Sequence, residues 1–272
     1  MIHLSINAIA MVAPGMPNWA QAQQMLSGKQ SYHHIPTTKK LTTFLPANEA
    51  RRCSRTISLA LSSITQLLEK SSFNEQEIRY IFSSCNGDLS IFHHISTALS
   101  QNGRPVSPTK FHNSVHNAPA GYCAIALGAQ TPSTSITAYQ DSVANALLEA
   151  AVQVANQKQA CLLTGYDEIP PEPLLSLFPI ADDFAYSLLI SPTHKTPIQE
   201  PALCRLSIAI TQGQKTSTME NQAFEKLRTA NPQAKILPLL EAIAKQEEKT
   251  IILNDNQQQI AIHVSEFSGK NP

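Results

Sequence analysis

The chain has 272 residues, enough to bury the core of one large domain or two small ones. Its 20 basic and 20 acidic residues balance and form no patch, which argues against nucleic acid or anionic lipid as a partner. The five cysteines are odd in number and widely spaced, as expected for reduced core thiols in a cytoplasmic protein. No basic leader and no run of about 18 apolar residues is present, so we expect a soluble, unexported protein.

The first part of the chain alternates strand and helix patterns. It predicts a strand at residues 2–10, a short helix at 18–26 and a polar loop at 27–43. The clearest helix follows Pro46, because apolar residues recur at steps of three and four from Ala50 to Leu68. A strand at 78–83, a turn at Asn86 and Gly87 and a helix at 90–99 come next. This alternation predicts an α/β fold with flanking helices and a mixed, mostly parallel sheet.

Residues 133–153 predict a strand that runs directly into a helix. Pro132 breaks the chain, residues 133–137 alternate as a short strand does, and Asp141 or Ser142 can begin a helix over 143–153. Tyr139 and Gln140 therefore fall at the junction. Enzymes often place a nucleophile at such a junction, because the free N–H groups of the helix stabilise a thiolate or an oxyanion. Neither a phenol nor an amide is a plausible acyl carrier, so these residues alone favour a simple capped helix.

The remaining segments predict a strand at 160–164, a surface connection at 191–201, which holds three prolines, and a strand at 206–211. Residues 212–272 differ in pattern. They predict helices at 223–229 and 237–244, then strands at 250–253 and 259–264 joined by a hairpin turn at Asp255 and Asn256. We therefore expect a main part at 1–211 and a helical and hairpin C-terminal extension at 212–272, packed on the same domain.

Three sets of residues could carry metal or proton chemistry. His112 and His116 are four residues apart, but Pro108 and Pro119 make a helix between them doubtful and no third ligand is evident, so polar loop histidines are favoured over a metal site. The adjacent pairs at 33–34 and 93–94 point apart and cannot chelate together. The acid pairs at 167–168 and 182–183 are expected to be solvated. We expect no metal and no cofactor.

Cys85 is the strongest candidate for a reactive thiol outside the junction. It follows an apolar strand and stands beside Asn86 and Gly87. No cation or partnered base is indicated near it, so a buried turn cysteine is the favoured interpretation.

The segment 111–142, with the sequence FHNSVHNAPAGYCAIALGAQTPSTSITAYQDS, resembles the ketoacyl synthases of the thiolase superfamily. In those enzymes Asn-x-x-Ala-Gly precedes a helix, followed by a Gly, a Pro, a strand ending in Thr-Ala-Cys, a second helix and a strand closing on Gly. The same order is kept here by Asn117, Ala120, Gly121, Gly128, Pro132, Thr137, Ala138 and Gly165. The place of the nucleophilic Cys falls on Tyr139, or on Gln140 if the one-residue gap lies elsewhere.

The resemblance extends along most of the chain. PANEARRCSRTISLALSSI, from Pro46, is similar to the Arg-rich first long helix of the synthases, and FAYSLLIS, from Phe184, to the strand that recrosses their sheet. The nearest family is the ketoacyl-synthase-like N-terminal family, which includes chain length factors of aryl polyene clusters. The second half of a complete synthase, with its two histidines, has no counterpart. The late histidines His194 and His263 fall in a proline-rich loop and in a strand that we expect at the edge of the sheet. The resemblance thus implies an abbreviated thiolase-like fold, about half of the full one.

The resemblance also implies a function. It indicates a non-catalytic chain length factor that forms a heterodimer with an active ketosynthase and shapes the acyl tunnel in type II fatty-acid or polyketide biosynthesis, with aryl polyenes as the specific candidate product. An acyl carrier protein would be contacted through that complex. Two alternatives stay open: an independent thiolase-like acyltransferase that uses Cys85 or Cys123, and a purely structural stabiliser of a synthase.

By the same resemblance, the partner interface lies on the strand at 133–137 and the loop at 111–120. The residues expected there are Phe111, His112, Ser114, His116, Asn117, Ser133, Ser135 and Thr137. Tyr122, Tyr139 and Gln140 are expected to line or floor the acyl tunnel.

Overall fold

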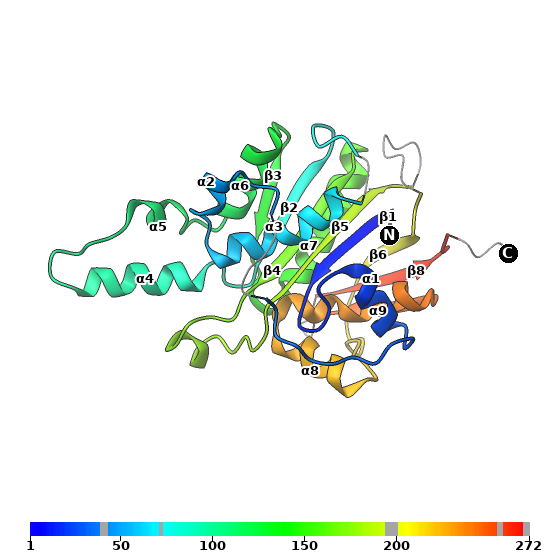
Figure 1. The fold of residues 1–272 in the computed structure, drawn as a ribbon. Coiled ribbons are helices and arrows are strands. Elements are labelled where there is room, and N and C mark those ends of the chain that lie inside the picture. The colour runs from blue at the N-terminus through cyan, green and yellow to red at the C-terminus, as the bar shows by residue number, and fades with distance from the viewer. Residues whose placement is uncertain (39–42, 71–72, 194–200, 255–257, 269–272) are drawn as a thin grey trace.

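The computed structural model describes residues 1–38, 43–70, 73–193, 201–254 and 258–268. They form one eight-stranded sheet with helices on both of its faces (Figure 1). The strands are β1 (Ile2–Val12), β2 (Arg79–Ser83), β3 (Ser133–Ile136), β4 (Cys161–Asp167), β5 (Phe184–Pro192), β6 (Cys204–Thr211), β7 (Lys249–Leu253) and β8 (Gln259–Ser265). Each predicted strand is found, within three residues of its expected bounds.

The strand order is β3-β2-β4-β5-β1-β6-β8-β7. β2 is parallel to β3 and to β4, whereas the other five neighbouring pairs are antiparallel. The sheet is therefore mixed, as expected, but the prediction that it is mostly parallel is wrong. Parallel neighbours need a crossover, and α-helices supply one only between β2, β3 and β4. β5 returns beside β4 without such a crossover, and β7 and β8 are consecutive antiparallel strands.

The helices are α1 (Trp19–Leu26), α2 (Ala47–Ala50), α3 (Arg55–Leu68), α4 (Leu89–Ser100), α5 (Pro108–His112), α6 (Ala118–Leu127), α7 (Ser142–Gln157), α8 (Gln222–Ala230) and α9 (Leu237–Lys245). Short 3₁₀ turns are η1 (Tyr139–Asp141), η2 (Leu174–Ser176) and η3 (Pro232–Ile236). The single helix predicted after Pro46 is in fact two. The side chain of Ser54 accepts a hydrogen bond from the N–H of Ile57, so a new helix, α3, begins there.

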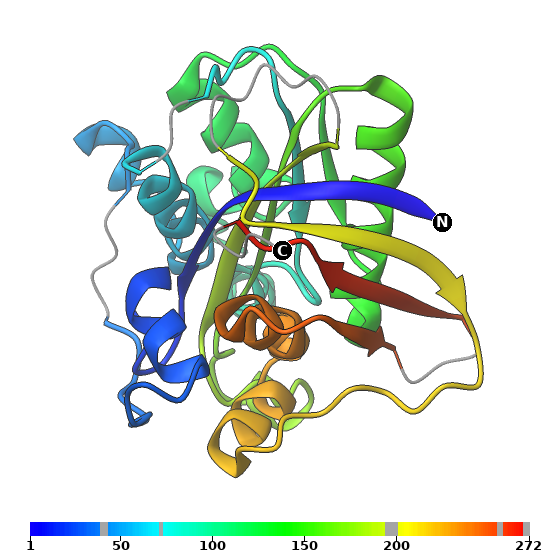
Figure 2. The same cartoon turned by 90° about the vertical axis from the view of Figure 1, so that its right-hand side faces the viewer.

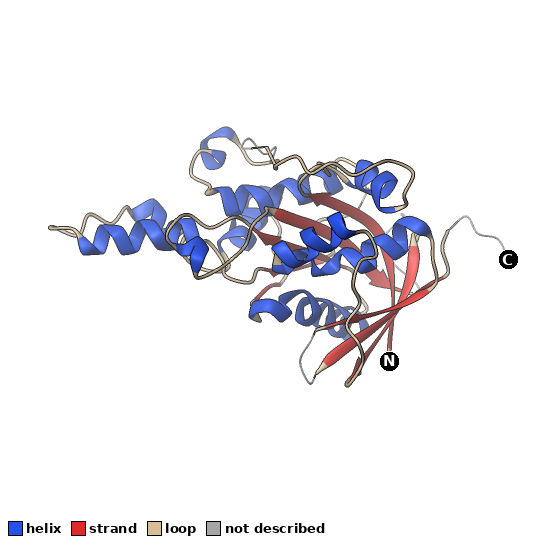
Figure 3. Ribbon diagram, turned by 90° about the horizontal axis from the view of Figure 1, so that it is seen from below, coloured by secondary structure: helices blue, strands red, loops and turns tan. Residues whose placement is uncertain are grey.

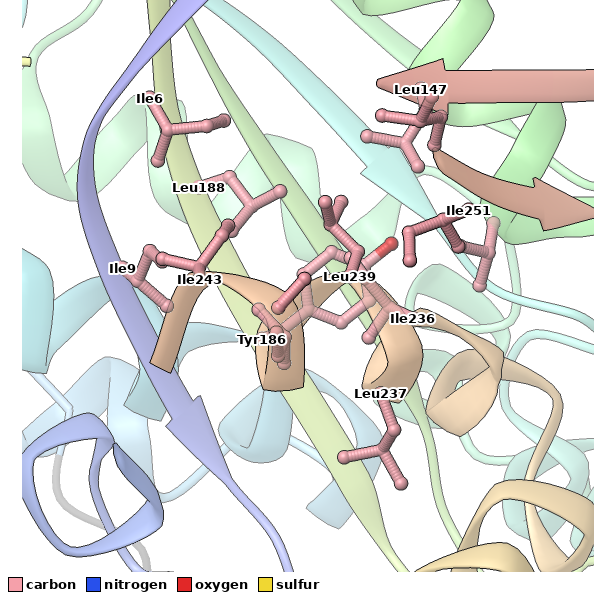
Figure 4. Close-up of a cluster of buried hydrophobic side chains, with 14 of the residues drawn as sticks. Ile6, Ile9, Leu147, Tyr186, Leu188, Ile236, Leu237, Leu239, Ile243 and Ile251 are labelled. Carbon is pink, nitrogen blue, oxygen red and sulfur yellow. The ribbon is translucent and has the colours of Figure 1, made fainter. Parts of the chain in front are cut away.

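Both faces of the central sheet are buried. On one face, α1, α7, α9 and η3 pack against the strands, and Figure 4 shows Leu147, Leu188, Leu239 and Ile243 among the side chains buried in this core. On the other face, α3 and α6 cover β2, β4 and β5. Figure 2 shows α3 and α7 on opposite sides of the sheet. Burial on both faces explains why β4 and β5 show no alternation of buried and exposed residues.

Residues 212–268 extend the same sheet where they are described. β8 pairs with β6 and lies between β6 and β7, so His263 is not on an edge strand as predicted. The expected hairpin turn at Asp255 and Asn256 and the late His194 lie outside the described residues, as does most of the 191–201 connection.

The pair α4 and α5 forms an arm that projects from the body of the molecule (Figures 1 and 3). Of the twelve residues of α4, the structure buries Leu89 and Ile91. Among the described residues, no helix has the length and apolar character that crossing a bilayer demands.

Candidate functional site

The strand-to-helix junction after β3 has a strained backbone. Tyr139 opens the η1 turn with φ of +50°, in the left-handed region that residues with a Cβ seldom adopt. Ser142, the first residue of α7, holds the turn: its hydroxyl donates to the carbonyl of Tyr139 at 2.7 Å and accepts the N–H of Ala138 at 3.0 Å. The sequence placed the helix start at Asp141 or Ser142, and both residues are used, Asp141 as the N-cap position.

The strain at Tyr139 can be measured. A Tyr139→Gly variant is expected to be more stable than Tyr139→Ala by about 1 kcal/mol, because glycine adopts positive φ without a Cβ penalty. The side chain of Tyr139 is exposed, so its removal leaves no cavity in either variant. Urea unfolding of both proteins gives the difference. Equal stabilities would mean that the left-handed turn is not populated.

An open pocket of about 580 Å³ lies between α2, α5 and α6, and we call it the α5–α6 pocket. It is lined by Glu49, Arg52, Pro108, Thr109, His112, Val115, Asn117, Ala118, Gly121, Tyr122 and Ile125. Tyr122 is buried, and its hydroxyl donates to Oδ1 of Asn113 at 3.1 Å. Tyr139 and Gln140 are not among the lining residues and lie at the surface. Of the three residues predicted for a tunnel, the structure thus puts only Tyr122 in this pocket.

Asp167 and Glu168 are buried, so the prediction that this acid pair is solvated is wrong. Asp167 ends β4, and its Oδ1 accepts hydrogen bonds from Oγ of Ser84 at 2.6 Å and from the N–H of Cys85 at 3.0 Å. Burial raises its pKa to about 7, and these donors oppose the rise. Burial also raises the pKa of Glu168 to about 7, and a hydrogen bond from Ser90 lowers it.

The second acid pair is only half as predicted. Asp183 is buried and forms an ion pair with Arg55 of α3, whereas Asp182 is partly exposed and pairs with His34 at 2.7 Å. The Asp183–Arg55 pair joins the loop between β4 and β5 to α3. The Asp182–His34 pair joins the same loop to the N-terminal segment.

The two candidate thiols lack the features of a nucleophile. Cys85 is buried, and burial together with the nearby Asp167 raises its pKa to about 12. Cys123 lies inside α6 with 1% of its surface exposed, and burial raises its pKa as well. Since the thiolate is the reacting form, both side chains are poorly suited to hold an acyl group near neutral pH.

His112 and His116 have different surroundings. His112 is the last residue of α5 and lines the α5–α6 pocket, so no helix joins it to His116, as predicted. His116 directs Nε2 toward the carbonyl of Ser84 at 3.4 Å. In the described ranges, no three His, Cys, Asp or Glu side chains come close enough to hold a metal ion.

The residues predicted for a partner interface lie on or just after β3, on α5 and in the segment that joins α5 to α6. β3 is at the edge of the sheet, so one row of its backbone groups has no strand partner among the described residues. Ser133, Phe111, His112, Ser114 and Asn117 are exposed. Thr137 is exposed too and donates from Oγ1 to the carbonyl of Cys85 at 2.8 Å, while Ser135 and His116 are half-buried.

The structure also exposes large apolar side chains in this part of the chain: Phe111 and Val115 fall in the segment predicted for the interface, whereas Phe92, Leu99 and Ile125 were not predicted there. We define the arm surface as Phe92, Leu99, Phe111, Val115 and Ile125, all exposed. The signal was present in the sequence, because the apolar residues of α4 form a stripe along one side of the helix and the structure buries only Leu89 and Ile91 of that stripe. A projecting helix of this kind indicates a protein partner.

Comparison with known proteins identifies the relatives of this chain. Residues 18–259 match the family described as beta-ketoacyl synthase, N-terminal domain. No curated protein matches the chain significantly.

Among solved structures, the chain is similar to the complex of the ketosynthase ApeO with its chain length factor ApeC from Xenorhabdus doucetiae (TM-score 0.73, 21% identity, 97% of this chain and 100% of that chain). It is also similar to the complex of the type II ketosynthase AntDE with its acyl-carrier protein AntF (TM-score 0.73, 10% identity, 98% and 99%). A beta-ketoacyl synthase from Burkholderia phymatum is a third (TM-score 0.61, 10% identity, 91% and 71%). At these low identities the structural likeness shows the fold alone, and it confirms the expected thiolase-like architecture.

Proposed function

Since the chain belongs to the beta-ketoacyl synthase, N-terminal domain family, we propose that it is a ketosynthase-like subunit without an acyl nucleophile, acting as the chain length factor of an active ketosynthase. The observation that carries the proposal is the junction after β3. It keeps the strained strand-to-helix turn of a nucleophile site, but presents the phenol of Tyr139 and the amide of Gln140 in place of a thiol. The burial of Cys85 and Cys123 supports the same conclusion and counts against an independent acyltransferase.

Tyr139, rather than Gln140, then occupies the vacant nucleophile position. A nucleophile elbow holds its reactive residue in an unfavourable backbone conformation so that the side chain is exposed between the strand and the helix. Tyr139 has both properties, with positive φ and an exposed side chain.

The partner would bind across β3 and the arm surface. The unpaired edge of β3 can continue the sheet into a ketosynthase by main-chain hydrogen bonds, and the exposed apolar side chains of the arm surface would be removed from water.

The solved complex of ApeO with ApeC is described as a ketosynthase with its chain length factor, which supports a partner of this class. An acyl carrier protein would deliver malonyl units to the ketosynthase, by analogy with the AntDE and AntF complex. Type II polyketide biosynthesis, with aryl polyenes as the specific candidate, is the pathway class we propose.

The acyl tunnel would end at the α5–α6 pocket. This pocket lies beside the proposed interface, it is partly apolar, and Tyr122 closes its inner side. Tyr139 and Gln140, exposed at the junction, would line the tunnel nearer to the active ketosynthase.

The test is the length of the product. The Tyr122→Leu variant, purified with its wild-type ketosynthase, is expected to shift the product distribution toward chains longer by at least one malonyl-derived unit, because a smaller side chain opens the floor of the tunnel. A steric wall of this kind costs the longest intermediate roughly 1–3 kcal/mol, enough to set the last condensation. The first condensation should keep its rate, because short intermediates do not reach the floor.

Tyr122→Phe is the matched control, since it keeps the ring and loses only the hydrogen bond to Asn113. Products are compared by mass spectrometry after supply of carrier protein and malonyl units, and the same comparison is made for Tyr139→Leu and Gln140→Ala. Unchanged lengths at all three positions, in complexes that assemble and turn over, would refute the tunnel and leave a purely structural stabiliser.

A further inference from the structure

The turn that follows β2, residues 84–87, is hydrogen-bonded to the carboxylate of Asp167. Oδ1 of Asp167 accepts the hydroxyl of Ser84 at 2.6 Å and the N–H of Cys85 at 3.0 Å, and its Oδ2 lies 3.1 Å from the same N–H. Oγ of Ser84 in turn accepts the N–H of Gly87 at 2.9 Å. Nearly the whole turn therefore depends on Asp167 for its shape. We call this segment the β2 turn.

The β2 turn contacts both halves of the proposed ketosynthase-binding surface. Thr137, at the end of the β3 edge, donates from Oγ1 to the carbonyl of Cys85 at 2.8 Å. His116, in the 111–120 segment, lies with Nε2 3.4 Å from the carbonyl of Ser84. The approach is close: a Cβ added to Gly87, which has φ of +66°, would lie 3.3 Å from Cδ2 of His116.

We propose that Asp167 is a positioning residue: through the β2 turn it sets the places of Thr137 and His116, and the affinity for the ketosynthase follows its ionisation. The proposal rests on the proposed function, because it concerns the same interface. Its physical basis is that an ionised carboxylate accepts charge-assisted hydrogen bonds with both oxygens, whereas the neutral acid gives weaker bonds and carries a proton that needs an acceptor.

The surroundings of Asp167 place its ionisation near neutral pH. Its carboxyl is buried, which raises its pKa to about 7 against the lowering effect of the donors on Ser84 and Cys85. The other titratable groups that face this region are Cys85 after β2, Tyr166 on β4, Tyr186 on β5, Asp88 before α4 and Lys235 in η3. Lys235 is the cation among them, and it acts on Cys85.

Binding of the ketosynthase should weaken as the pH falls through the pKa of Asp167. Above pH 7 Asp167 is ionised and holds the turn, so the ketosynthase should bind tightly. At pH 6 only about a tenth of the molecules keep the ionised form, and the apparent Kd should rise by roughly tenfold relative to pH 8.

The experiment measures the Kd for a cognate ketosynthase at pH 6 and pH 8. In wild type the ratio of the two values should be near ten. Asp167→Asn keeps an oxygen in the place of Oδ1 but cannot ionise, so its ratio should fall toward the residual value set by the ketosynthase itself. Ser84→Ala removes a donor that lowers the pKa of Asp167, so the midpoint of the pH profile should move upward. A purely structural role of Asp167 would not predict that movement.

Two controls separate other titrating groups. The double variant His112→Gln and His116→Gln removes two imidazoles from the proposed interface. Because Asp167 is still present, the variant should keep the pH ratio, whatever its absolute affinity. Glu168→Gln removes the neighbouring buried acid, whose hydrogen bond comes from Ser90 and not from the β2 turn, and should keep the ratio as well. A ratio that survives in Asp167→Asn, or disappears in either control, overturns the inference. Absence of binding by wild type at both pH values would instead refute the proposed function.

Discussion

Replacing Gly165 by alanine is expected to destabilise the protein by about 3 kcal/mol, a large fraction of the stability of a typical domain. Gly165 lies in β4, under two side chains that have no exposed surface. An added Cβ would lie 2.3 Å from Cε1 of Tyr186 and 2.4 Å from Oε1 of Gln233. Neither group can swing into solvent, because both are fully buried, so the strand or η3 must move.

Gly121→Ala is the matched control for this substitution. Gly121 lies in α6, and no atom lies within 4 Å of its added Cβ. Alanine should therefore leave stability unchanged or raise it by up to about 1 kcal/mol through helix propensity. Urea unfolding of both variants gives the comparison. Comparable stabilities for the two would show that β4 and η3 are less tightly packed than the structure indicates.

The order of strands and helices was predictable because the local patterns and caps are strong. Asn18, for example, accepts a hydrogen bond from the N–H of Gln21 and begins α1 at the predicted place. The direction of β5 was not predictable in the same way. An apolar strand has the same pattern whether it runs parallel or antiparallel to its neighbour, and the pairing of β5 with β1 joins residues about 180 positions apart.

The burial of Asp167 was missed for a related reason. Next to Glu168 and two prolines, an aspartate looks solvated, and its hydrogen-bond partners Ser84 and Cys85 come from a turn 83 and 82 positions earlier in the chain. Only the parallel pairing of β2 with β4 brings the two ends together. The hydrogen bonds of Asp167 with Ser84 and Cys85 could thus be found only from the tertiary structure.

The junction itself was predictable from Pro132, the alternating strand and the helix start, but its strain was not. Tyrosine is an uncommon choice for positive φ, so nothing in the residue type points to the left-handed turn at Tyr139. The sequence left both Tyr139 and Gln140 open as the vacant nucleophile position. The arm was missed because α4 has the apolar stripe of an ordinary flanking helix, and nothing in its sequence shows that the body of the molecule leaves most of that stripe uncovered.

Replacing Phe111 by aspartate is expected to weaken binding of the ketosynthase by at least about 100-fold, equivalent to roughly 2.7 kcal/mol. Phe111 has 66% of its surface exposed in the free chain, so the variant should fold normally and lose only what the complex buries. A carboxylate in its place would have to be stripped of water against the apolar arm surface without a counter-charge.

Ile210→Asp provides the matched control, because Ile210 is 60% exposed and lies on β6, five strands away from β3 in the sheet. It introduces the same charge in place of an apolar side chain of similar exposure, and should leave the affinity within about twofold, as expected for a site outside the interface. Co-expression followed by size-exclusion chromatography and calorimetry with the ketosynthase distinguishes the two. The wild-type chain alone should self-associate through the uncovered surface, and Phe111→Asp should reduce that self-association as well. If Ile210→Asp abolished the heterodimer while Phe111→Asp left it intact, the ketosynthase would have to bind the opposite end of the sheet, and β3 with the arm surface would no longer be its docking site.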